Sequence, residues 1–212
     1  MPKGKSIFTQ AVHAGERGPR PDFTPVSMPV HSSVGYLYDD MANLDGVFGG
    51  ERSGFVYPRY GSPTVSAFEE AVAELEGGDE AVAFASGMGA IHAALMGAGV
   101  QAGKSVVAAA DLYGATYALL ERTFASLGVR VRFVDITDLD LVGQAIADEQ
   151  PTGVLCEIIS NPLMKVADVP ALADMVHSAG ATLIVDSTFA SPYLFRALEQ
   201  GADYAVHSAT KY

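Results

Sequence analysis

The sequence predicts an α/β fold whose central sheet is mainly parallel and has helices on both faces. Two observations predict it. Short apolar runs, mostly rich in β-branched residues, alternate with helical patterns over residues 62–212. Polar side chains follow several of these runs, and open parallel sheets bind ligands beyond the carboxyl ends of their strands. Residues 1–61 are instead rich in Pro, Gly, Ser and Tyr without a sustained period, so we expect an extended arm there.

The regular part opens with an amphipathic helix. Ser62 suits its N-cap, Pro63 suits its first position, and Gly77 and Gly78 end it. Its apolar residues fall on one face: Val65, Phe68, Val72 and Leu75. We expect the strands at 81–86, 105–111, 129–135, 153–160, 181–188 and 204–210, and the remaining helices near 88–99, 115–128, 139–149, 169–180 and 193–201. Strands that alternate with helices form crossovers, which make neighbouring strands parallel.

Composition limits the possible partners. Hydrophobic residues make up 49% of the chain and charged residues 18%, as is typical of a globular protein. The net charge of −12 would repel nucleic acid and anionic membranes, so we expect neither as a partner. Cys156 is the single cysteine, which allows no internal disulfide and favours a cytoplasmic location. We see no signal-peptide pattern and no apolar stretch of membrane-spanning length.

The first candidate site is the stretch AFASGMGAIHAA, which reads as a strand, a tight glycine turn and a helix start. Backbone N–H groups around Ser86, Gly87 and Met88 could hold a phosphate there. Gly87 and Gly89 also match part of a dinucleotide fingerprint, but His92 stands where the third glycine should be. A turn that merely needs glycine is the other interpretation.

Two further candidates carry charge at strand ends. Asp186 ends a very apolar strand, where its carboxylate either caps a helix or faces a ligand cation. Lys211 is framed by Ser208 and Thr210, whose hydroxyls suit phosphate oxygens. A lysine desolvated at such a position loses its proton more readily, as an amine nucleophile requires, although a solvated lysine is the common case.

Aromatic and amide groups complete the set. Tyr113 follows a strand and could stack on a ring or pack in the core. Asn161 could contact a ligand or start a turn before Pro162. Tyr57 and Arg59 lie in the arm and could clamp a phosphate. A phosphate cradle, a stacking aromatic, an anion, an amide and an amine together suit pyridoxal 5'-phosphate.

Six motifs together resemble the Cys/Met-metabolism family of pyridoxal-phosphate enzymes, which includes cystathionine γ-lyase, cystathionine γ-synthase, methionine γ-lyase and O-acetylhomoserine sulfhydrylase. The resemblance runs from about Thr9 to Tyr212 and rests on VYPRYGSPT, FASGMGAI, DLYGATY, SNPLMKVADV, LIVDSTFASPY and HSATKY. It implies pyridoxal-phosphate fold type I, with an arm over residues 1–61 that contacts a neighbouring subunit and a cofactor-binding large domain over residues 62–212 that stops just after the lysine. Because family members are about twice this length, a smaller C-terminal domain with the arginine for the substrate carboxylate would be absent.

The resemblance implies catalytic roles for three residues. Lys211 would form the Schiff base with the cofactor and move protons at the α and β carbons of an amino-acid substrate. Asp186 would pair with the protonated pyridine nitrogen. Tyr113 would stack on the ring and assist proton transfer to the leaving group.

Other residues would bind the cofactor. Asn161 would contact its phenolic oxygen, and the remaining contacts would come from Ser86, Gly87, Met88, Thr188, Ser208 and Thr210, mainly at the phosphate. Tyr57 and Arg59 would reach the phosphate in a neighbouring subunit, which implies a homo-oligomer, at least a dimer and usually a tetramer. Glu157 would order its loop.

The implied reaction removes or replaces the γ-substituent of a cystathionine- or homoserine-type amino acid, with cystathionine γ-lyase favoured. Cystathionine γ-synthase and O-acetylhomoserine sulfhydrylase are alternatives, whereas Ala115 stands where methionine γ-lyases usually have Cys and disfavours that activity. An aminotransferase of the same fold is disfavoured by the Tyr57 and Arg59 motif. An inactive fragment and a dinucleotide-binding oxidoreductase are the remaining alternatives.

Overall fold

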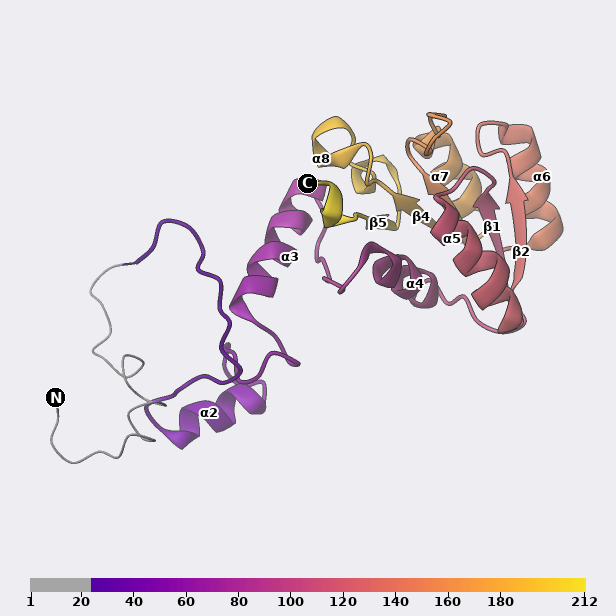
Figure 1. Ribbon diagram of the computed structural model, residues 1–212. Helices are drawn as coiled ribbons and strands as arrows, with labels where there is room; N and C mark the ends of the chain where they lie inside the picture. The colour runs from indigo at the N-terminus through magenta and orange to yellow at the C-terminus, as the bar shows by residue number, and fades with distance from the viewer. Residues whose placement is uncertain (1–23) are drawn as a thin grey trace, which may run out of the picture. The chain divides into compact units, whose positions relative to one another are not determined.

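The computed structural model describes residues 24–212, and the part of the predicted arm before residue 24 lies outside this range. The chain forms two units that divide between Thr64 and Val65 (Figure 1).

In the described part of the first unit, from residue 24, the chain forms a short helix, α2 (Met41–Phe48), within the predicted extended arm. Asp40 caps it by accepting a hydrogen bond from the Asn43 N–H at 2.7 Å. Its second carboxylate oxygen accepts from the Asn43 side chain at 2.9 Å. The Asp40 cap is therefore the sequence signal that the prediction of an extended arm overlooked.

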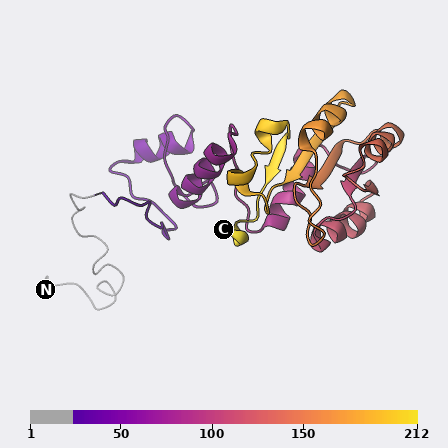
Figure 2. The ribbon, with the colours of Figure 1, turned by 90° about the horizontal axis from the view of Figure 1, so that it is seen from above.

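The second unit is built on a five-stranded parallel sheet in the order β2-β1-β3-β4-β5. The strands are β1 (Ser105–Ala109), β2 (Arg130–Val134), β3 (Gly153–Glu157), β4 (Thr182–Asp186) and β5 (Tyr204–Val206). Figure 2 shows the yellow C-terminal strand at one edge of the sheet. All five strands were predicted, and β1 and β3 are buried along their whole length, as expected for apolar runs in a parallel sheet.

Helices cover both faces of this sheet (Figure 1). The helix α3 (Pro63–Glu76) precedes α4 (Gly87–Gly97), α5 (Gly114–Ala118), α6 (Leu139–Glu149) and α7 (Val169–Ser178). Right-handed crossovers place α6 and α7 on one face and α5 on the other, because the direction of strand addition reverses after β2. Asp138 and Asp168 cap α6 and α7 by accepting from the third backbone N–H that follows each of them.

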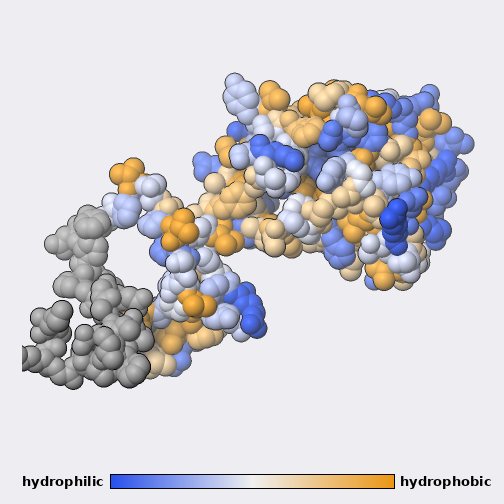
Figure 3. All heavy atoms as spheres, viewed as in Figure 1, coloured by the Kyte–Doolittle hydropathy of each residue, from blue (hydrophilic) through white to orange (hydrophobic). Residues whose placement is uncertain are grey.

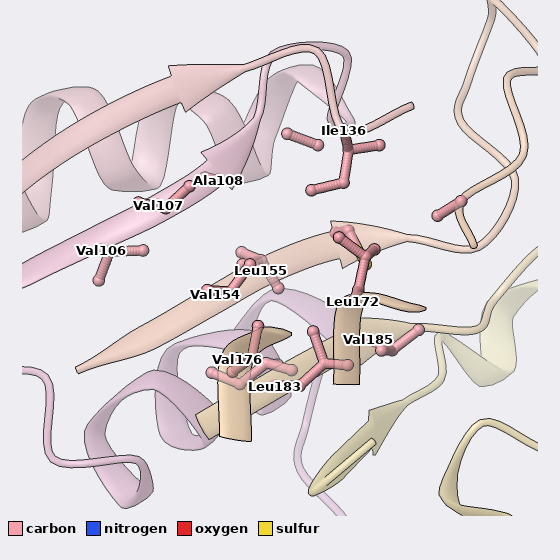
Figure 4. Packing of buried hydrophobic residues seen from close by; sticks show 14 of the residues in the cluster. Val106, Val107, Ala108, Ile136, Val154, Leu155, Leu172, Val176, Leu183 and Val185 are labelled. Atoms are coloured by element: carbon pink, nitrogen blue, oxygen red, sulfur yellow. The ribbon is translucent and has the colours of Figure 1, made fainter. Parts of the chain in front are cut away.

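The core lies between the sheet and its helices. Figure 4 shows Val154 and Leu155 of β3, Leu183 of β4, and Leu172 and Val176 of α7 within one buried cluster. These five side chains are fully buried. Burial of such a side chain stabilises the fold by about 1.5–3 kcal/mol, so this layer holds the carboxyl ends of the strands in register.

The expected strand at 81–86 is absent. Residues 81–84 have no strand partner within the described chain, and the Ala83 N–H donates to the Glu69 carboxylate at 2.8 Å. Val82 and Phe84 remain exposed by 68% and 47%. An apolar β-branched run therefore forms a strand only where a neighbouring strand meets its backbone groups.

Two expected helices are also interrupted. The stretch expected near 193–201 forms α8 (Ser191–Leu194) and a 3-10 turn, η2 (Leu198–Gln200), because the extended backbone of Phe195 separates them. Ala197 between them is fully buried. The stretch near 115–128 continues from α5 into a π-helix, η1 (Leu119–Phe124).

Charge is distributed unevenly over the second unit. Figure 3 shows hydrophilic residues gathered at the end that carries β2 and α6. Ion pairs at that end join Arg130 to Glu149 and Arg132 to Asp148. Within residues 24–212, no helix combines the length and the apolar character needed to cross a membrane.

Candidate active site

A cavity of about 310 Å³ lies beyond the carboxyl ends of the strands in the second unit. It lies beside the place where the strand order reverses, between β1 and β3, which is where open α/β sheets bind ligands. Its lining brings together ten of the twelve predicted site residues: Ser86, Gly87, Met88, Tyr113, Asn161, Asp186, Thr188, Ser208, Thr210 and Lys211.

One side of the cavity is built to bind an anion. The Ser86 hydroxyl caps α4 by accepting from the Gly89 N–H at 3.1 Å. The N–H groups of Gly87 and Met88 have no hydrogen-bond partner among residues 24–212. These two donors at a helix N-terminus, with the hydroxyls of Ser208 and Thr210 in the same lining, suit a phosphate.

The Gly87 position depends on having no side chain. A Cβ atom at residue 87 would lie 3.0 Å from Ser208 Cβ and 3.2 Å from its Oγ. The start of α4 and the segment after β5 therefore meet in van der Waals contact, and glycine permits the approach.

Asp186 is not a helix cap, since no helix begins near it before Ser191. Its Oδ1 accepts from the Thr188 N–H at 3.0 Å, which is its only hydrogen bond within the described chain. The carboxylate is half-buried in the cavity lining, so the interpretation that it faces a ligand cation fits its position better. Thr188 in turn accepts from the Ser208 N–H at 2.9 Å and ties the segments after β4 and β5 together.

Glu157, at the end of β3, connects two loops of the cavity. Its two oxygens accept from the backbone N–H groups of Tyr113 at 2.5 Å and Asn161 at 3.2 Å. Burial, together with the nearby Asp186 and Asp111 carboxylates, raises the pKa of Glu157 to about 7, although the two N–H donors act in the opposite direction. Glu157 thus holds in place the segments that carry two predicted cofactor contacts.

Tyr113 and Asn161 both lie on loops. The Tyr113 side chain is 51% exposed at the cavity, so the alternative of core packing is wrong. Asn161 begins a turn, as one interpretation expected, and it also lines the cavity. Both alternatives considered for Asn161 are therefore compatible.

Lys211 differs from expectation in its surroundings. It lies in the 3-10 turn η3 (Ala209–Lys211), five residues after the end of β5. It lines the cavity but is exposed, so the desolvated lysine that we expected is not present in the described chain.

Tyr57 and Arg59 belong to the first unit. The Arg59 guanidinium carbon lies 5.6 Å from the centre of the Tyr57 ring, so the two side chains form a cation–π pair. The role of this pair at a cofactor stays a prediction.

Five lining residues were not among the predicted site residues: Ile91, Glu157, Ile159, Phe189 and Val206. Ile159 and Val206 lie at or just after strand ends, and Phe189 directly follows Thr188. Their closeness in sequence to predicted site residues or to strand ends was the signal that could have identified them. The four apolar side chains among them, all except Glu157, form walls of the cavity, which polar motifs do not reveal.

The lining fits pyridoxal phosphate. Two free N–H groups and two hydroxyls match a phosphate, a carboxylate matches a ring N–H, and an amine is available for an aldehyde. The partial match to a dinucleotide fingerprint has a simpler explanation, because residue 87 must be glycine to let Ser208 lie close to it.

Comparisons with known proteins agree with this chemistry. The family model of Cys/Met-metabolism PLP-dependent enzymes matches residues 8–212. An O-acetyl-L-homoserine sulfhydrylase from Leptospira meyeri is 37% identical over the whole chain and 47% of its own length. An L-methionine gamma-lyase from Fusobacterium nucleatum is 38% identical over 99% of the chain and 52% of its own length.

A solved structure is similar too. A putative O-acetylhomoserine (thiol)-lyase from Campylobacter jejuni, which contains a pyridoxyl-lysine, has a TM-score of 0.79 and 29% identity over 89% of this chain and 46% of its own. The chain spans about half the length of the curated relatives it matches. The predicted fold and cofactor are confirmed, and the chain belongs to the Cys/Met-metabolism family of pyridoxal-phosphate-dependent enzymes.

Proposed function

We propose that this chain is the cofactor-binding part of an enzyme that eliminates or replaces the γ-substituent of a cystathionine- or homoserine-type amino acid, with cystathionine γ-lyase as the favoured activity. One observation carries the proposal: residues from five separate segments, 86–88, 113, 161, 186–188 and 208–211, line one cavity. Their donors, acceptors and amine match a single cofactor.

Pyridoxal phosphate, when bound, supplies an aldehyde for covalent attachment and a ring that accepts electrons. In our proposal the N–H groups of Gly87 and Met88 and the hydroxyls of Ser208 and Thr210 hold its phosphate. Asp186 keeps the ring nitrogen protonated by offering a carboxylate to it.

The remaining groups act on the substrate. Lys211 takes a proton from the α carbon and then moves protons at the β carbon, because its flexible stem lets the amine reach both. Tyr113 stacks on the ring and delivers a proton to the leaving group. Glu157 holds the loops of Tyr113 and Asn161 through their N–H groups.

We further propose a cytoplasmic homo-oligomer in which the arm, residues 1–61, contacts a neighbouring subunit and the large domain spans residues 62–212. The exposed Tyr57 and Arg59 pair supports this role, since a cation beside an aromatic ring can clamp the phosphate of a partner's cofactor. The single buried cysteine is consistent with a reducing compartment.

The test is the visible absorbance of the full-length protein purified with pyridoxal phosphate, before and after Lys211→Ala. We expect the band of the lysine-bound cofactor in the wild type and its loss in the variant, because alanine has no amine. A band that persists unchanged in Lys211→Ala contradicts the assignment of Lys211.

A substrate panel then distinguishes elimination from replacement. It contains cystathionine, methionine, homocysteine and O-acetylhomoserine, and it scores ketoacid and sulfide release. The relatives include a sulfhydrylase and a lyase of nearly equal identity, so the panel contains substrates for both reactions. Ketoacid release from cystathionine is the expected result, and inertness toward all four amino acids would overturn the substrate class.

A further inference from the structure

The turn that carries Lys211 is closed by a bond between the side chains on either side of it. His207 precedes the turn and Tyr212 follows it. The His207 Nδ1 and Tyr212 Oη atoms lie 2.7 Å apart. This hydrogen bond, called the bridge below, links the residues that flank the segment 208–211 and so holds the two ends of that segment close together.

Two further hydrogen bonds anchor the bridge to other elements. Glu76, the last residue of α3, places its Oε1 2.5 Å from His207 Nε2, and the side chains of this pair are only 3% and 8% exposed. The Tyr212 hydroxyl donates to the Thr188 carbonyl oxygen at 3.3 Å. The chain of contacts therefore runs from α3, across the turn, to the segment that follows β4, the strand that ends at Asp186.

The chemistry of these contacts favours a rigid arrangement. Hydrogen bonds gain strength where water is excluded, and the Glu76–His207 pair is buried. Partial burial and the carboxylates of Asp186 and Glu76 raise the pKa of Tyr212 to about 12, so its phenol keeps its proton at neutral pH. Lys211 itself makes no side-chain hydrogen bond within the described residues, so its amine is positioned by the turn alone.

We propose that Glu76, His207 and Tyr212 form a clamp that positions Lys211 for covalent attachment of an aldehyde cofactor. The inference rests on the proposed function, in which the Lys211 nitrogen bonds to the aldehyde carbon and the aldehyde oxygen leaves as water. The three residues are positioning residues, because they act through the turn and not on the cofactor. Misplacing a reacting group by 1 Å can cost about 100-fold in rate, so the clamp matters for the rate of attachment.

The decisive variant is Tyr212→Phe in the full-length protein, which keeps the ring but removes the hydroxyl between His207 and Thr188. Residue 212 is 62% exposed, so folding should be retained. We expect the attachment of added pyridoxal phosphate to the cofactor-free protein, followed by visible absorbance, to slow about tenfold, because the hydroxyl's hydrogen bonds to His207 and Thr188 are both lost. Tyr204→Phe is the matched control, since Tyr204 is 38% exposed and its hydroxyl makes no hydrogen bond within the described residues, and it should attach the cofactor at the wild-type rate.

A double-mutant comparison separates positioning from general damage. In a Lys211→Ala background, Tyr212→Phe should change the dissociation constant of non-covalent pyridoxal phosphate less than about twofold, because no amine remains to be positioned. His207→Gln, which keeps one donor for Glu76, should slow attachment in the same way.

Two results would overturn the clamp. One is attachment of the cofactor by Tyr212→Phe at the wild-type rate. The other is a roughly tenfold rise in the dissociation constant of non-covalent pyridoxal phosphate when Tyr212→Phe is added to Lys211→Ala. A visible band that survives in Lys211→Ala alone would instead overturn the proposed function.

Discussion

At the scale of single residues, Glu157 shows how one carboxylate can organise a site without reacting. It accepts from two backbone N–H groups, those of Tyr113 and Asn161, and it lies near two further acids, Asp186 and Asp111. Its position at the end of a fully buried strand makes ionisation costly, which is why its pKa rises from 4.5 to about 7. The native state therefore holds this proton more tightly than the unfolded chain does.

Glu157→Gln should remove a pH dependence of stability. Between pH 4.5 and about 7 the unfolded chain releases this proton freely and the native state retains it, so wild-type stability falls as pH rises, by up to about 3 kcal/mol. Thermal midpoints of the cofactor-free protein at pH 5 and pH 8 measure the effect, and the wild type should lose more between them than Glu157→Gln. Glu70→Gln, at an exposed helix position, is the control. Parallel pH profiles for all three proteins would refute the raised pKa.

At the scale of elements, the site depends on how closely the start of α4 approaches the segment after β5. Gly87 and Ser208 meet in direct contact, and the Ser208 N–H is held by the Thr188 hydroxyl. The anion-binding side of the cavity is therefore assembled from three segments that are distant in sequence. A larger side chain at their contact is therefore expected to move these segments apart and to disturb the anion-binding side of the cavity.

Gly87→Ala should weaken cofactor binding. The new Cβ would lie 3.0 Å from Ser208 Cβ, so Ser208 must move away, and we expect the dissociation constant of pyridoxal phosphate to rise about tenfold. Fluorescence titration of the cofactor-free protein measures it. Gly114→Ala adds the same methyl group near the site, at a position with nothing within 4 Å, and should leave the affinity unchanged. An unaltered affinity in Gly87→Ala would show that the contact does not shape the site.

At the scale of the whole molecule, much apolar surface is left for other chains or segments to cover. Phe68 and Leu75 of α3 are 46% and 54% exposed, although they lie on the face that amphipathicity assigns to packing. With Tyr193 and Leu194 of α8, they line a second cavity. Large exposed apolar patches mark interaction surfaces, which supports the proposed homo-oligomer.

Subunit complementation tests the proposed role of the arm. If Arg59 serves a partner's cofactor, a mixed dimer of Arg59→Ala and Lys211→Ala subunits has one intact site, since one site keeps both residues and the other loses both. Co-expression in equal amounts should then restore about one quarter of the wild-type activity, whereas each variant alone is inactive or nearly so. Activity no higher than the sum of the separate variants would mean that Arg59 acts within its own subunit or not at the site.

Most of the strands and helices were predictable from local sequence patterns. The apolar runs that became β1 and β3 and the capped pattern of α6 were predicted because their burial or capping is set by nearby residues. Residues 81–84 failed as a strand because pairing needs a partner that a local pattern cannot supply. The helix expected near 193–201 is interrupted because Phe195 adopts an extended backbone between α8 and η2.

The sequence by itself determined the family, the cofactor and the residue types at the strand ends, since each motif is a short contiguous stretch that can be recognised without the structure. Only the tertiary structure decided which of these groups meet in one cavity, because β1, β3, β4 and β5 bring their carboxyl ends together through pairing over long separations. It also decided that Glu157 joins two loops and that Glu76 reaches His207 across 131 positions. Contacts of that range depend on packing, which no stretch of the chain specifies alone.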